Sequence, residues 1–175
     1  IAAEKLFMRG DNDGARRSLV NYLQTFPEGA FSSNANFYLG SIAFAKKEFD
    51  EAVQRFKSVI ASGDTKFLEE SVARTAEIEY LGNDYPAALE SLQIVAENPE
   101  NKQAARLGIM RCALQTGQQK DALLAADELL KEPKLSPELE AEARYVRAKA
   151  YIDQKQANKA LADLKELSKD TRTVH

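Results

Sequence analysis

The stretch FYLGSIAFAKKEFDEAVQRF, residues 37–56, decides the fold. Its first half places Leu39 and Ala43 on one face of a helix, and its second half places Ala52 and Phe56 on one face of another. The lysine-rich stretch between the halves is too short to do more than reverse the chain. The segment therefore predicts two antiparallel helices joined by a tight turn.

The alanine of this segment recurs along the whole chain in matching contexts. The recurring positions are Ala15, Ala52, Ala88, Ala122 and Ala160, separated by 34 to 38 residues. A period of this length is typical of helical-hairpin repeats, in which each unit buries its apolar face by stacking on its neighbours. The sequence therefore predicts an all-α solenoid of antiparallel helix pairs.

Residues that are expected to end or cap helices recur with a similar period. Residues expected to close the second helices are Pro27, Gly63, Pro99 and Pro133. Residues expected to cap the first helices in the left-handed conformation are Gly10, Lys47, Asn83, Gly117 and Lys155. Asp84 and Ser136 are predicted to be N-caps, and residues 11–14 are predicted to form a turn with an N-cap.

These signals predict about ten helices within one array that spans residues 1–175. The expected helices are 1–9, 11–26, 32–46, 49–61, 67–81, 84–97, 101–116, 118–131, 137–154 and 156–168. The expected units are 1–31 (partial), 32–66, 67–100, 101–135 and 136–175.

The recurring alanine has a steric explanation. Helix axes that approach to about 8–10 Å leave little room for side chains at the crossing. Small residues of the first helices, expected to face the alanines, are Gly40, Ala76 and Ala148. Bulkier residues expected to fill the space between units are Leu19, Phe56, Leu92 and Leu164.

Composition argues against several classes of function. The chain has 24 basic and 27 acidic residues, a net charge of -3, and no basic stripe, so we expect no nucleic-acid partner. No apolar run is long enough to cross a bilayer. With only Cys112 and His175, the chain cannot supply a His/Cys metal cluster or an internal His-based triad. We therefore predict a protein that is not an enzyme and has no cofactor or metal.

The signature residues resemble those of the tetratricopeptide repeat (TPR) family. The run Phe37-Tyr38-Leu39-Gly40, followed by Phe49-Asp50-Glu51-Ala52 and Phe56, is similar to the family signature in its usual order. The resemblance extends over essentially the whole chain and implies a right-handed superhelix. The tryptophan often found early in the first helix is missing, and Met110 stands where the fourth unit should have a small residue.

The sequence from the end of the first unit into the second is similar to that of TPR proteins of the bacterial cell envelope. Residues 22–27, YLQTFP, followed by Asn34-Ala35 and residues 37–40, resemble Tol–Pal-associated TPR proteins and the TPR lipoprotein of the β-barrel assembly machinery. This similarity implies a bacterial periplasmic or outer-membrane-associated setting.

The resemblance also implies where a ligand would bind. In TPR arrays, the first helices line the concave face and hold peptide segments there. The matching positions in this chain are Phe7, Phe37, Ser41, Phe44, Glu77, Tyr80, Leu107, Arg111, Leu114, Tyr145, Lys149 and Ile152. Each aromatic residue among them could alternatively pack against the neighbouring unit. The Lys, Asn and Arg clamp that holds acidic chaperone tails is absent from the second and third units, which argues against such a tail as ligand.

Three functions remain open at this point. The leading hypothesis is a non-catalytic scaffold that holds a protein or peptide segment on its concave face. A second is a structural spacer that assembles with itself through the ends of the solenoid. A third is a regulatory segment of a larger bacterial envelope protein.

Overall fold

The computed structural model describes residues 2–97 and 102–170, and the chain divides into two compact units, 1–82 and 83–175. Within the described ranges all regular structure is helical, which confirms the all-α prediction. The two units are described separately below.

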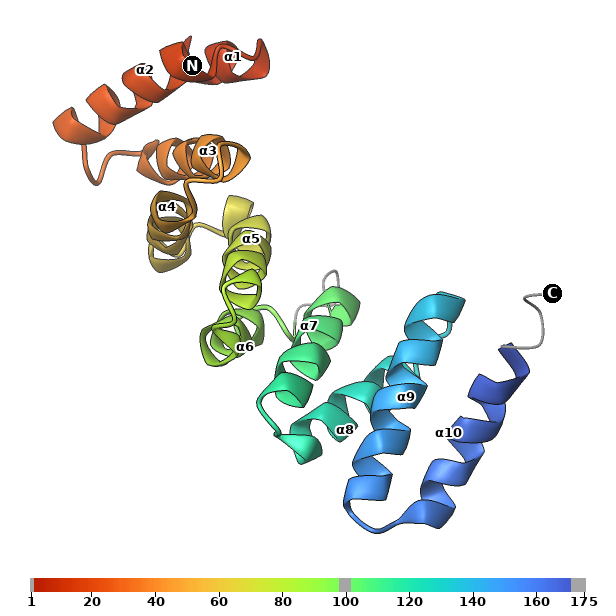
Figure 1. The fold of residues 1–175 in the computed structure, drawn as a ribbon. Helices are drawn as coiled ribbons and strands as arrows, with labels where there is room; N and C mark the ends of the chain where they lie inside the picture. The colour runs from red at the N-terminus through yellow and green to blue at the C-terminus, as the bar shows by residue number, and fades with distance from the viewer. Residues whose placement is uncertain (1, 98–101, 171–175) are drawn as a thin grey trace. The chain divides into compact units, whose positions relative to one another are not determined.

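The first unit contains two helical hairpins and the first helix of a third (Figure 1). Its elements are α1 (Ala2–Met8), α2 (Asn12–Thr25), α3 (Ser32–Ala45), α4 (Phe49–Ala61), a short 3-10 helix (Thr65–Phe67) and α5 (Leu68–Leu81). Each α-helix packs on the next along the chain. This stacking of sequence neighbours is the arrangement that the repeat predicts.

The second unit continues the same pattern. Its helices are α6 (Tyr85–Gln93), α7 (Lys102–Gln115), α8 (Gln119–Leu129), α9 (Pro137–Asp153) and α10 (Ala157–Asp170). The expected helix over 84–97 ends early, because Ile94–Glu97 form turns and the β-branched residues Ile94 and Val95 favour helix less. Three predicted helix boundaries lie outside the described residues: residue 1, Pro99 and residue 101.

The turns inside the hairpins have the predicted left-handed conformation. The φ angles are 81° at Gly10, 60° at Lys47, 61° at Asn83, 72° at Gly117 and 60° at Lys155. A Schellman hydrogen bond, from the following residue back to a carbonyl in the last helical turn, accompanies four of them. These bonds are Asp11 N to Leu6 O (3.0 Å), Glu48 N to Ala43 O (2.9 Å), Gln118 N to Ala113 O (2.8 Å) and Gln156 N to Tyr151 O (2.8 Å).

The predicted N-caps are also confirmed. The Asp11 carboxylate accepts a hydrogen bond from the Gly14 amide at 2.9 Å, which fixes the start of α2. The Asp84 carboxylate caps α6, and the Ser136 hydroxyl caps α9 in front of Pro137. Each cap satisfies one of the amides that a helix start leaves without an intrahelical partner.

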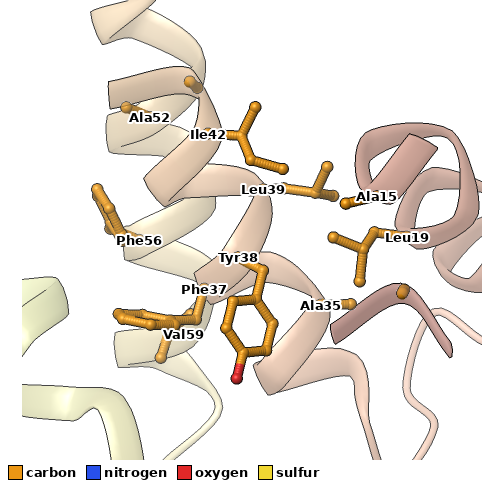
Figure 2. Packing of buried hydrophobic residues seen from close by; sticks show 12 residues of the cluster. Ala15, Leu19, Ala35, Phe37, Tyr38, Leu39, Ile42, Ala52, Phe56 and Val59 are labelled. Carbon is orange, nitrogen blue, oxygen red and sulfur yellow. The ribbon is translucent and has the colours of Figure 1, made fainter. Parts of the chain in front are cut away.

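The core of the first unit lies around α3 (Figure 2). Side chains of α3 lie between Ala15 and Leu19 of α2 on one side and Ala52 and Phe56 of α4 on the other. All five recurring alanines of the chain are almost completely buried, with relative exposures of 0 or 1%. The recurring alanines therefore mark positions where helices pack against each other.

Glycine allows two of the closest approaches between helices. A Cβ atom added to Gly40 of α3 would lie 2.8 Å from the ring of Phe56 in α4. A Cβ atom added to Gly108 of α7 would lie 2.5 Å from a methyl group of Leu92 in α6. Such distances are far inside van der Waals contact, so α4 and α6 pack where they do because these positions have no side chain.

The second unit packs a smaller core around Met110, which is fully buried although the repeat usually has a small residue there. Small neighbours make room for this side chain, among them Ala113, Ala126 and Ala143. One packing prediction is wrong in this unit. Leu164 of α10 was expected to fill space between units, but 42% of its surface is exposed because no described helix covers that face of α10.

Replacing Ala52 with leucine should destabilise the first unit by about 1–3 kcal/mol, because the added atoms would overpack the contact of α4 with the rest of the core. The check is denaturant unfolding followed by helicity. The same substitution at the exposed Ala61, on the same helix, should change stability by less than about 0.5 kcal/mol. Equal midpoints for the two variants would contradict this account of the recurring alanine.

Candidate functional site

In the first unit, Phe37 belongs to the core instead of to an open face. Its ring is buried and stacks on Phe67, with 4.1 Å between ring centroids and an angle of 8° between planes. Among the sequence-predicted site residues, this aromatic side chain is therefore used for packing. Phe7 of α1 is half-buried, and its ring lies 5.0 Å from that of Tyr38.

Tyr38 also fixes α1 to α3 by a polar contact. Its hydroxyl donates a hydrogen bond to the Glu4 carboxylate at 2.8 Å. Burial, together with this bond to a carboxylate, raises the pKa of Tyr38 to about 12. The same hydrogen bond lowers the pKa of Glu4. The pair is thus held as neutral phenol and carboxylate, which favours the hydrogen bond.

The face of the first helices α3 and α5 joins an aromatic ring to charged side chains. The guanidinium of Arg74 lies 4.7 Å from the centroid of the Phe44 ring, and its Nη1 lies 3.2 Å from Glu77 Oε2. Such a cation–π contact stabilises by about 0.5–1 kcal/mol at exposed sites. Phe44 and Tyr80 are half-buried, and Glu77 is exposed. The face therefore offers apolar surface next to exposed charge.

Ser41 lies on the same side of α3, but its hydroxyl is already bound. It donates to the carbonyl of Phe37, one turn earlier, at 2.9 Å. A ligand could still reach the hydroxyl oxygen as an acceptor, because the side chain is only half-buried.

In the second unit, α7 and α9 are joined by a two-point ion pair. Arg111 Nε and Nη2 each lie 2.7 Å from one oxygen of Glu142. This bidentate geometry is the strong form of the arginine–carboxylate interaction. Leu107 and Leu114 of α7 are half-buried against the core.

Three of the predicted site residues, one helical turn apart, form an exposed row on α9. Tyr145 is 56% exposed, Ile152 is 50% exposed, and the exposed Lys149 lies between them. Within the described residues, Lys149 forms no ion pair. Next to Lys149 is a small hollow of about 170 Å³, lined also by Leu114, Val146 and Asp153. The row therefore combines exposed apolar surface, an available cation and a recess.

A buried ion cluster, which was not predicted from the sequence, joins α8, α9 and α10. Asp163 is only 1% exposed, and its carboxylate accepts hydrogen bonds from Arg144 at 3.1 Å and Arg147 at 2.7 and 2.6 Å. Arg147 also donates to Asp127 of α8 at 2.9 Å. The hydrogen bonds that Arg147 donates to Asp163 raise the pKa of Arg147 further. The only signal in the sequence was a carboxylate at a helix position that otherwise holds neutral or basic residues.

In the described part of the chain, no group of three His, Cys, Asp or Glu side chains could hold a metal ion. None of the described helices is both long enough and apolar enough to cross a membrane. Cys112 is the only cysteine of the chain, and its side chain is buried.

Stacked helical hairpins with a small residue at each crossing define a helical-repeat protein. The family model described as "Tetratricopeptide repeat" matches residues 2–65 and 76–138. The chain belongs to this family, whose members are in general non-catalytic scaffolds for protein interactions.

Solved structures agree with this assignment. The chain is similar to MamA, at 17% identity and a TM-score of 0.70, with 98% of this chain and 95% of MamA covered. It is similar to YrrB, described as a TPR protein with an unusual peptide-binding site, at 19% identity and a TM-score of 0.73, covering 98% and 84%. A MamA fragment from Desulfovibrio magneticus RS-1 matches at 15% identity and a TM-score of 0.66, covering 99% and 93%. These likenesses confirm the solenoid fold. No curated protein matches the sequence with significant similarity.

Replacing Asp163 with alanine should destabilise the second unit by about 1–3 kcal/mol, because two arginines would lose a buried hydrogen-bond partner, although Arg147 keeps its contact with Asp127. Denaturant unfolding followed by helicity measures the loss. Glu166→Ala removes a carboxylate from an exposed ion pair on the same helix and should leave the midpoint unchanged. If Asp163→Ala also leaves the midpoint unchanged, the cluster does not hold α10.

Proposed function

We propose that this protein is a non-catalytic scaffold that holds a peptide segment of another protein on the face of its first helices, the concave face of the family. The observation that carries the proposal is the exposed row Tyr145, Lys149 and Ile152 on α9. Large apolar side chains left in water cost free energy that a partner can recover by covering them. A cation between two apolar residues adds a polar contact that can set the direction and register of a peptide.

The neighbouring helix supplies the rest of this binding face. Leu114 of α7 and Lys149 of α9 both line the small hollow, which could receive one side chain of the ligand. The Arg111–Glu142 pair connects α7 to α9, so the two helices present their side chains in a fixed relation. Leu107 adds apolar surface one turn before Arg111. A rigid face lowers the entropy lost on binding.

The first unit offers a comparable face of its own. Phe44, Glu77 and Tyr80 supply partly exposed aromatic and charged groups there, with Ser41 and Phe7 beside them. Phe37 is not part of the proposed face, because its ring is buried against Phe67. YrrB, described as having a peptide-binding site, is similar in fold, which supports peptide recognition as the general role.

A random peptide library displayed on phage should contain peptides that bind the protein, and Tyr145→Ala together with Ile152→Ala should weaken their binding by about tenfold or more. Both residues are exposed, so helicity should not change. Leu81→Ala, a substitution of an exposed residue on α5 outside this face, serves as the matched control.

Three outcomes of this experiment would count against the proposed face. The library could yield no binder, the double variant could bind all selected peptides as tightly as the original, or the control could weaken binding equally. The last result would show an effect that is not specific to the row on α9.

A second candidate function is self-association through α10, the structural role considered from the sequence. Leu161 and Leu164 lie on one side of α10 and are 50% and 42% exposed. This strip could be covered by a second copy of the chain.

A setting in a bacterial cell envelope is also part of the proposal, as is a role as a segment of a larger envelope protein. Both are supported by the sequence of residues 22–40 alone.

If α10 mediates self-association, light scattering across a concentration series should show oligomers. Leu161→Lys with Leu164→Lys should return the protein to a monomer, because two cations would have to be buried at the interface. A protein that stays monomeric at every concentration would exclude this role for the chain.

A further inference from the structure

A second hollow lies between α6, α7 and α8, separate from the face of the first helices. Its volume is about 450 Å³, within the range of about 300–1,000 Å³ that is usual for ligand pockets. Apolar side chains form much of its lining: Leu89, Ala96, Ile109, Leu124 and Ala125. Leu124 is 62% exposed, so the hollow has an apolar edge that is open to water.

The position of the hollow on α7 distinguishes it from the proposed peptide face. Arg106 and Ile109 of α7 line the hollow, whereas Leu107, Arg111 and Leu114 belong to the face of the first helices. At about 100° per residue, these two sets point to different sides of α7. The helix therefore contributes to two surfaces at once.

Acidic groups surround the apolar lining. Glu97, Asp121 and Glu128 line the hollow, and its only lysine or arginine is Arg106. Arg106 is already engaged, since its Nη2 lies 3.0 Å from Glu128 and its Nη1 lies 3.2 Å from Glu132. Glu128 is paired with Lys131 as well, at 2.7 Å. Within the described residues no ion pair neutralises Glu97 or Asp121.

This hollow is an apolar recess with two unneutralised carboxylates at its edge. A complementary ligand therefore combines an apolar group with a positive charge. We propose that this hollow is a second docking site, which takes a basic amphipathic peptide segment of a partner protein, with an apolar side chain placed in the recess and a Lys or Arg beside it. The apolar side chain covers Leu124, and the basic group meets Asp121 or Glu97. An acidic segment is excluded by like-charge repulsion at the same edge.

The test uses the complete chain and two synthetic peptides of equal length. One peptide carries leucine and lysine at helical spacing, and the other carries glutamate in place of every lysine. Fluorescence anisotropy should show saturable binding of the leucine–lysine peptide, weakened by added salt, and no binding of the glutamate peptide. Leu124→Lys should weaken binding by about tenfold or more, because it places a cation where the peptide brings its own. Asp121→Asn, which keeps the shape of the side chain and removes its charge, should weaken binding by a smaller factor.

Leu81→Lys is the matched control, because Leu81 is 65% exposed, as Leu124 is, but lies on α5 outside the hollow. It should bind the leucine–lysine peptide as the original protein does. The same is expected for the Tyr145→Ala and Ile152→Ala variant. Circular dichroism confirms that each variant keeps its helicity.

Several results would overturn the proposal. The leucine–lysine peptide could fail to bind, the glutamate peptide could bind equally well, or Leu124→Lys could bind as tightly as the original. Equal weakening by Leu81→Lys and Leu124→Lys would show a general effect of net charge and would also overturn it.

Discussion

The close approach of paired helices is the constraint on which the rest of this structure depends. Where α3 meets α4 and where α6 meets α7, glycine leaves space that Phe56 and Leu92 occupy. The recurring alanines are buried almost completely at their own helix contacts. Since the inner sides of the helices are used for these contacts, the other sides stay exposed. The proposed binding faces would thus follow from how the hairpins pack, and small side chains would decide both.

The helix α7 shows how one element can serve two surfaces. Arg111 and Arg106 lie on different sides of it, and each is bound by carboxylates of a different neighbour, Glu142 of α9 in one case and Glu128 of α8 in the other. Both arginines therefore orient helices instead of offering free charge. The charges that are left for partners are of opposite sign on the two sides: Lys149 on the first-helix face, and Asp121 with Glu97 at the hollow. This difference would allow the two surfaces to select different ligands.

The sequence predicts those features of the structure that depend on local backbone conformation or on the space available to a side chain. The left-handed turns and the buried alanines follow from backbone conformation and available volume, which a residue type reports directly. Phe37 was ambiguous, because an apolar residue on a helix face has the same spacing whether Phe67 or a ligand covers it. Asp163 could not be found, since a lone carboxylate in a helix is usually solvated and its arginine partners are 16 and 19 residues away. The acidic hollow depends on three helices together, so no single motif predicts it.

The attachment of α10 has a thermodynamic consequence. Apart from Ala160, the fully buried residue of this helix is Asp163, so ionic hydrogen bonds replace much of the apolar contact found elsewhere in the chain. Detaching α10 would therefore expose less hydrocarbon than detaching a helix from the core around α3, and the accompanying change in heat capacity would be smaller. Apolar packing weakens on cooling because of its large heat capacity, so the attachment of α10 should weaken less on cooling than the packing of that core.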